Sequence, residues 1–176
     1  PGHPELGHTA GVETTTGPLG QGFATAVGMA IARDHLASIF NKDDIKIIDH
    51  VILGICSDGD LMEGVSHEAA SLAGHLKLSK LVFFYDDNNI TIDGKTDITY
   101  SDDVARRFEA YGWQVLTILD VNNSDQVDRV IKLCRTTCEK PTLIITKTHI
   151  GFGSPNKQDK SSSHGAPLGE EEVRLT

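Results

Sequence analysis

The segment VILGICSDGD at residues 51–60 and the segment LVFFYDDNN at residues 81–89 decide the fold. Each begins with a run rich in β-branched or aromatic residues, which is typical of a buried strand, and each ends in acidic or amide side chains. Residues 61–75 between them have the length of one helix. A strand, a helix and a second strand over this span predict a right-handed crossover, which sets the two strands parallel and adjacent.

The polar ends of these two strands are expected to meet at one edge of the sheet. Asp58 follows the first apolar run and Asn88 follows the second. Ligands of open α/β sheets bind at the carboxyl edge, and the side-chain oxygens of Asp and Asn suit a hard cation such as Mg²⁺. The pair therefore predicts a divalent-metal site that could hold a diphosphate.

Patterns elsewhere extend this unit into a βαβαβ succession. Helices are expected at 19–40 and 102–111, with a third running from its cap at Ser124 to about residue 138, and strands are expected at 113–119 and 142–147. The first of these helices would pack through a stripe that contains Phe23, Val27, Ala30 and Ile31. The expected fold class is α/β, a three-layer, mainly parallel sheet with helices on both faces.

Composition and charge narrow the class of protein. The chain begins at Pro1 and stops in an acidic, helix-like segment, so we expect residues 1–176 to be a single domain taken from a longer protein. A net charge of −9, from 16 Lys and Arg against 25 Asp and Glu, argues against nucleic acid as a partner. The sequence contains no apolar run of about twenty residues, so it predicts no membrane span. The three cysteines fit neither a disulfide set nor a zinc site, which favours a cytoplasmic location.

Common calcium- and phosphate-binding motifs do not explain the two strand ends. Residues 58–60 resemble the start of an EF-hand loop, but Met62 and Glu63 stand where that loop needs an oxygen ligand and a glycine. Neither a P-loop nor a Gly-x-Gly-x-x-Gly fingerprint follows a strand. Gly59 could instead admit a phosphate to the start of the next helix. The polar segment 151–163 is either a solvated loop or an active-site loop, and its place after a strand favours the second.

Five separated blocks, in order, resemble the transketolase family and cover essentially the whole chain. They are GVETTTGPLGQG at 11–22, SLAGHLKL at 71–78, YDDN at 85–88, FEAYGW at 108–113 and HGAPL at 164–168. The two strand ends also resemble the thiamine diphosphate motif, which begins Gly-Asp-Gly and ends in Asn-Asn. Ser57 departs from this motif, in which glycine is usual; a small serine keeps the space but could tighten the turn.

The resemblance implies that the site binds thiamine diphosphate through Mg²⁺, with Ca²⁺ or Mn²⁺ as substitutes. Asp58 and Asn88 would give side-chain oxygens to the metal, and Ile90 would give its backbone carbonyl. The implied contacts to the cofactor itself come from Gly59 and Asn88 at the diphosphate end, Gly17 and Leu19 at the aminopyrimidine, and Ile92 at the thiazolium.

The resemblance also implies an activity and its catalytic residues. Glu63 matches a glutamate in a carboxylate network across a homodimer interface, and His3 and His164 match histidines near the donor's hydroxyls and the reacting oxygens. The implied enzyme is a transferase of the pentose phosphate pathway, moving a two-carbon ketol unit between sugar phosphates. The chain would supply the metal and diphosphate half of a site completed by a second domain and a second subunit. Alone, it is expected to be inactive.

Two other interpretations stay open. A related thiamine diphosphate enzyme, such as dihydroxyacetone synthase or a split transketolase subunit, would share these motifs and differ in its substrates. A noncatalytic binding module that keeps the fold would share them too. Its support is Ser57, which departs from the motif, and the expectation that the chain is only part of a longer protein.

Overall fold

The computed structural model describes residues 4–136 and 139–176, which form a four-stranded parallel sheet in the order β1-β2-β4-β3. The strands are β1 (Ile52–Ser57), β2 (Leu81–Asp87), β3 (Gln114–Ile118) and β4 (Thr142–Lys147). β1 pairs with β2 from Ile52 opposite Leu81 to Ser57 opposite Asp86, so the predicted crossover between adjacent parallel strands is confirmed.

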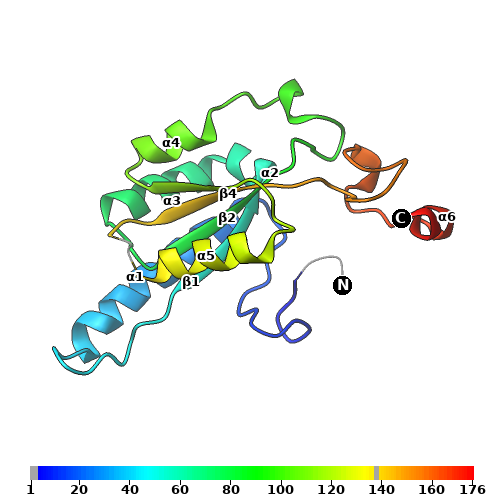
Figure 1. The fold of residues 1–176 in the computed structure, drawn as a ribbon. Helices are drawn as coiled ribbons and strands as arrows, with labels where there is room; N and C mark the ends of the chain where they lie inside the picture. Colours follow the sequence, from blue (N-terminus) through cyan, green and yellow to red (C-terminus); the bar gives the residue numbers. More distant parts are fainter. Residues whose placement is uncertain (1–3, 137–138) are drawn as a thin grey trace.

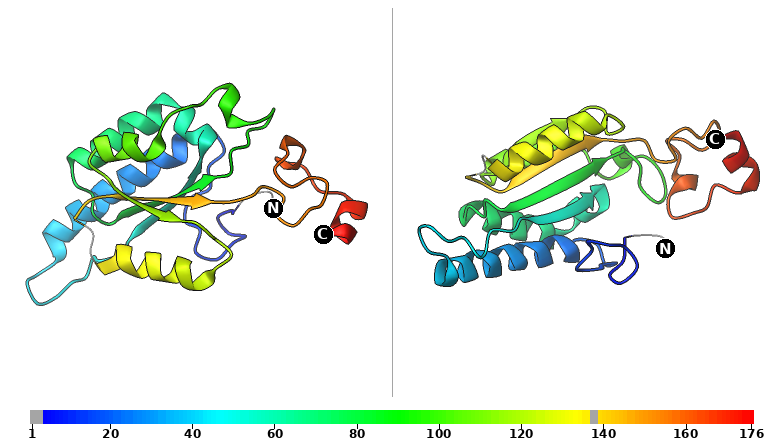
Figure 2. Two further views of the ribbon diagram at one scale, coloured as in Figure 1. Left: turned by 45° about the horizontal axis from the view of Figure 1, so that its top comes forward. Right: turned by 60° about the horizontal axis from the view of Figure 1, so that its bottom comes forward.

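Helices cover both faces of the sheet, as expected for a three-layer α/β fold (Figure 1). They are α1 (Gln21–Phe40), α2 (Asp58–Met62), α3 (Gly64–His75), α4 (Val104–Ala110), α5 (Ser124–Thr136) and α6 (Glu170–Leu175), with single 3-10 turns at Thr96–Ile98 and Ser161–Ser163. Figure 2 shows α1, α3 and α4 on one face and α5 on the other. No helix among the described residues is long and apolar enough to cross a membrane.

The larger core lies on the face covered by three helices. Phe23 of α1 stacks on Phe83 of β2 with ring centroids 4.1 Å apart, and Trp113 donates its indole N–H to the Ala70 carbonyl of α3 at 2.8 Å. The core on the opposite face is smaller. It lies between α5 and the strands β2, β4 and β3. Leu53 and Ile55 of β1 point to that same face and are 61% and 74% exposed.

The predicted helix at 61–75 is wrong in one respect, because α2 and α3 are separate helices that meet at Glu63. Glu63 is extended, with ψ of 132°. Side chains from α3 bond to the carbonyls at the break: Ser66 Oγ donates to Asp60 O at 2.6 Å, which also accepts from Glu63 N at 3.3 Å, and His67 Nε2 donates to Leu61 O at 2.5 Å. The break therefore leaves these buried groups bonded.

Two details of other helices also differ from expectation. The buried residues of α1 are Phe23, Ala26, Val27 and Ala30, whereas Ile31, which was expected on this stripe, is 37% exposed. The cap of α5 is Asn123, whose Oδ1 accepts from Gln126 N at 3.1 Å, and Ser124 is already helical. The predicted end of this helix, residue 138, lies outside the described residues.

Candidate active site

Asp58 stands where β1 meets α2, buried at the carboxyl edge of the sheet. Only 4% of the residue is exposed. The Tyr85 hydroxyl of β2 donates to Asp58 Oδ1, whereas Oδ2 is buried and has no hydrogen-bond partner among the described residues. A buried carboxylate oxygen without a donor is costly unless a cation or a ligand reaches it.

The local electrostatics favour a cation at this oxygen. Burial raises the pKa of Asp58, the hydrogen bond from Tyr85 opposes this, and the carboxylates of Asp87 and Asp86 add to the rise. The pKa of Tyr85 is also raised, chiefly by burial and by its bond to Asp58, so this hydroxyl keeps its proton and acts as a donor. A divalent cation here would offset the repulsion among the three carboxylates.

Asn88 follows β2 with its amide held in a defined orientation. Its Nδ2 donates to Asp86 Oδ2 at 3.0 Å, and its Oδ1 accepts from Ile90 N at 2.8 Å. Asn89 then turns the chain with a left-handed φ of 61°, a conformation that Asn tolerates. The amide oxygen of Asn88 retains a second lone pair, so it can also bind a metal ion.

The end of β4 brings two residues that were not expected at the site. Lys147 pairs in register with Asp87, and its ammonium donates to Asp87 Oδ2. Thr148 Oγ1 donates to Asp86 Oδ1. A cavity of about 370 Å³ opens here, and its lining includes Asp58, Tyr85, Asp87, Tyr100 and Lys147.

The donor set fits a metal that shares its coordination with a phosphate ligand. Within residues 4–136 and 139–176, no three His, Cys, Asp or Glu side chains converge as a metal site. Asp58 offers one carboxylate, and Asn88 and Ile90 can add an amide oxygen and a carbonyl oxygen. Mg²⁺ is commonly held by one or two carboxylates, with phosphate oxygens and water completing its octahedron.

Asp60 joins the turn after β1 to the N-terminal loop. Ser57 N donates to Asp60 Oδ2 at 3.0 Å, and Gly20 N donates to Oδ1 at 2.9 Å. Ser57 is extended, with φ of −130° and ψ of −178°, so serine needs no special conformation there, and its hydroxyl completes a capping box with Asp60. Leu19 packs over Gly59: a Cβ on Gly59 would lie 3.2 Å from Leu19 Cδ1.

Replacing Asp60 by asparagine is expected to lower the free energy of unfolding by about 1–2 kcal/mol. The carboxylate accepts from two backbone donors through its two oxygens, whereas an amide has one oxygen and turns an NH₂ group toward the other donor. Urea denaturation measures the change. Asp44→Asn, on an exposed loop, is the control, and an equal loss in the two variants would contradict this role for Asp60.

The remaining predicted site residues are spread over several segments. Leu19 and Ile92 are 50% and 68% exposed, so both side chains are accessible to a ligand, and Gly17 is also exposed. Glu63 is exposed at the break between α2 and α3. His164 is exposed on the segment that leaves the sheet after β4, and it does not line the cavity at Asp58. His3 lies outside the described residues.

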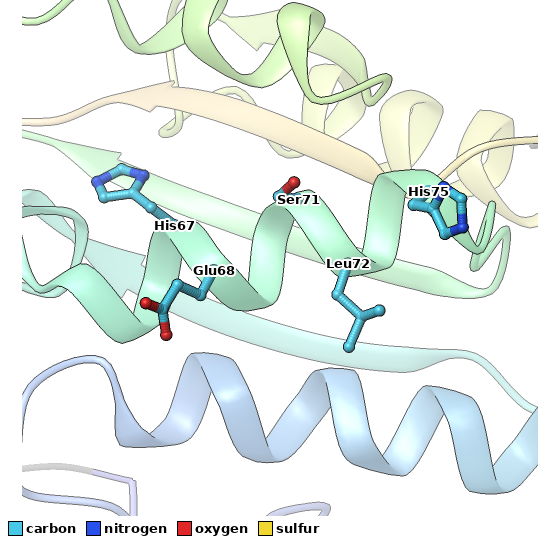
Figure 3. A pocket seen from close by; sticks show the side chains of 5 residues that line it. All are labelled: His67, Glu68, Ser71, Leu72 and His75. Carbon is cyan, nitrogen blue, oxygen red and sulfur yellow. The ribbon is translucent and has the colours of Figure 1, made fainter.

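A second, open depression of about 640 Å³ lies on the outer face of α3 (Figure 3). It is lined by His67, Glu68, Ser71, Leu72 and His75. His67 is already engaged: its Nε2 donates to Leu61 O, so Nδ1 can accept from the Tyr111 hydroxyl at 3.3 Å. Burial lowers the pKa of His67, which favours this neutral form. Its ring therefore ties α3 to α2 and to Tyr111.

Comparison with known proteins places this geometry in a family. Residues 1–176 match the family model described as transketolase, thiamine diphosphate binding domain. The chain is 56% identical to the transketolase of Geobacillus stearothermophilus over 176 residues, covering 100% of this chain and 26% of that protein. It therefore spans about a quarter of the length of the curated relatives it matches.

Solved structures agree with the sequence relatives. Transketolase from Leishmania mexicana superposes with a TM-score of 0.90 at 46% identity, over 99% of this chain and 26% of that one. A Pichia stipitis transketolase in complex with sedoheptulose 7-phosphate gives a TM-score of 0.90 at 42% identity, over 95% of this chain and 25% of that one. The chain therefore belongs to the transketolase family and represents its thiamine diphosphate-binding domain.

Proposed function

We propose that the chain is one domain of a longer transketolase and supplies the half of the active site that holds Mg²⁺ and the diphosphate. The observation that carries this proposal is the buried, unpartnered Oδ2 of Asp58 at the carboxyl edge of the sheet. Asn88 follows the neighbouring strand, and the relatives over the whole chain are transketolases.

In this proposal, each segment of the site binds or positions a different part of the metal–cofactor complex. Asp58, Asn88 and the Ile90 carbonyl would bind the metal, and the backbone of Gly59 would meet the diphosphate. Asp60 would keep the loop of Gly17 and Leu19 against this turn, so that both ends of the cofactor meet a fixed surface. Exposed Ile92 would give the thiazolium an apolar wall. When bound, thiamine diphosphate supplies the carbanion stabilisation needed to break and form carbon–carbon bonds.

The substrates are proposed to be sugar phosphates, as in the Pichia stipitis complex with sedoheptulose 7-phosphate. His164 and His3 would move protons at the donor's hydroxyls and the reacting oxygens, because an imidazole can both donate and accept a proton. Glu63, exposed at the end of α2, would meet the second subunit of a homodimer. This assembly would complete the site.

Replacing His164 by alanine in the full-length protein is expected to lower the turnover number by about 100- to 10,000-fold, the usual contribution of general acid–base catalysis. Transfer from xylulose 5-phosphate to ribose 5-phosphate measures the effect, and calorimetry should show cofactor affinity nearly unchanged. His35→Ala, on the exposed side of α1, is the control.

An unchanged turnover number in the His164 variant would remove the role proposed for this side chain. The wild-type assay also tests the reaction itself. Preference for formaldehyde over ribose 5-phosphate as acceptor would favour dihydroxyacetone synthase, and absence of any transfer despite cofactor binding would favour a noncatalytic module.

A further inference from the structure

The segment between β4 and the end of α6 is ordered largely by its own hydrogen bonds. It extends beyond the carboxyl edge of the sheet (Figure 1). Lys157 Nζ donates to Leu168 O at 2.8 Å, and Gly153 N donates to Gln158 Oε1 at 2.9 Å. Gly151 takes a left-handed φ of 62°, and a Cβ there would lie 2.9 Å from Ser163 Oγ. The segment therefore has one defined backbone course.

Glu172 of α6 is the buried polar centre of this segment. It is 7% exposed, whereas its neighbours Glu170 and Glu171 face solvent. Its Oε1 accepts from the Ser154 hydroxyl and from Asn156 N at 2.8 Å, and its Oε2 accepts from Asn156 Nδ2 at 3.0 Å. These hydrogen bonds lower the pKa of Glu172 and favour the carboxylate.

The hydrogen bonds continue from Glu172 to the residue beside His164. Ser154 Oγ, held by the carboxylate, accepts from Lys157 N at 3.0 Å. The Lys157 carbonyl in turn accepts from Ser163 Oγ at 2.6 Å. Ser163 immediately precedes His164, whose own N–H donates to Ser161 O at 2.9 Å. The exposed imidazole thus stands on a backbone that is fixed through three linked contacts.

We infer that Glu172 is a positioning residue that holds the loop 154–163 in the course that presents His164 to the substrate. This inference rests on the proposed transketolase function. The carboxylate touches no reacting atom; it replaces solvent as the acceptor for donors at Ser154 and Asn156, and so limits the loop to one conformation. Misplacement of a reacting group by about 1 Å can cost about 100-fold in rate.

The test uses the full-length protein with Glu172→Ala, Glu172→Gln and the control Glu171→Ala. Glu171 belongs to the same helix turn but is exposed and paired with Arg174, so its loss should leave turnover unchanged. Glu172→Ala is expected to lower the turnover number by about 10- to 100-fold, with the dissociation constant of thiamine diphosphate unchanged within about twofold. Glu172→Gln should recover part of the activity, because its amide oxygen can still accept from Ser154 and Asn156 N, whereas its NH₂ group would face the Asn156 Nδ2 donor.

A double variant separates positioning from a general structural role. If Glu172 acts through His164, then Glu172→Ala should reduce turnover no further in the His164→Ala background. A further loss of the same factor in that background would overturn the inference, and so would full activity of Glu172→Ala. Failure of the wild-type protein to transfer ketol units would instead overturn the proposed function, and with it the role given to Glu172.

Discussion

Asp58→Ala is expected to weaken the binding of Mg²⁺ with thiamine diphosphate by about two to three and a half orders of magnitude. Removing one partner of a buried charge pair costs about 3–5 kcal/mol, and each 1.4 kcal/mol is a factor of ten in affinity. Asp58 is 4% exposed, and its Oδ2 has no other partner among the described residues, so the carboxylate has an oxygen ready for a cation.

Calorimetric titration of the full-length protein measures this loss. Asp58→Asn is the informative companion, because it keeps the shape and an oxygen that Tyr85 can reach while it removes the charge. Both variants should lose affinity, and Asp44→Ala on an exposed loop should not. Wild-type affinity in Asp58→Ala would mean that the metal binds elsewhere.

Gly74→Ala is expected to destabilise the fold by about 3 kcal/mol or more, at the upper end of what an overpacked core costs. A Cβ at Gly74 would lie 1.8 Å from the Tyr111 carbonyl oxygen and 3.3 Å from the Trp113 ring. The first of these atoms is backbone between α4 and β3, so no side-chain rotation can make room. Helix α3 would have to move away from the strand that follows Tyr111.

The unfolding free energy in urea tests this expectation, with Gly28→Ala as the matched control. Gly28 also lies inside a helix, but nothing is within 4 Å of its added Cβ. Alanine there should stabilise the protein by up to about 1 kcal/mol through helix propensity. A Gly74 variant as stable as wild type would show that α3 and the Tyr111 backbone are not in close contact.

The sequence alone predicted the local parts of this fold well. The strand at 142–147 is β4 with the same bounds, because a strongly apolar run follows Pro141. The pairing of β1 with β2 followed from one short crossover, because strands that are consecutive in the chain are usually neighbours in the sheet. These features depend on residues close together in the chain, and they were enough to place Asp58 and Asn88 at one edge.

The contacts that complete the site depend on pairings that are distant in sequence. Strand β4 lies between β2 and β3, and this order brings Lys147 to Asp87. The sequence predicted Tyr85 only as a strand residue. Its hydrogen bond to Asp58, 27 positions earlier, depends on how the two side chains pack in the folded protein. Asp60 had no separate role in the sequence analysis, and the hydrogen bond that it accepts from Gly20 N joins residues 40 positions apart. The roles of His164 and Glu63 stay predictions.

Anomalous diffraction from crystals of the full-length protein, grown with Mn²⁺ and thiamine diphosphate, tests the metal site most directly. We expect one strong Mn²⁺ peak within about 2.0–2.6 Å of Asp58 Oδ2 and Asn88 Oδ1, the range of Mg²⁺ and Ca²⁺ to their oxygen ligands, with the Ile90 carbonyl and diphosphate oxygens in the same shell. A peak that lies away from Asp58, or bound cofactor with no metal between Asp58 and Asn88, would contradict it.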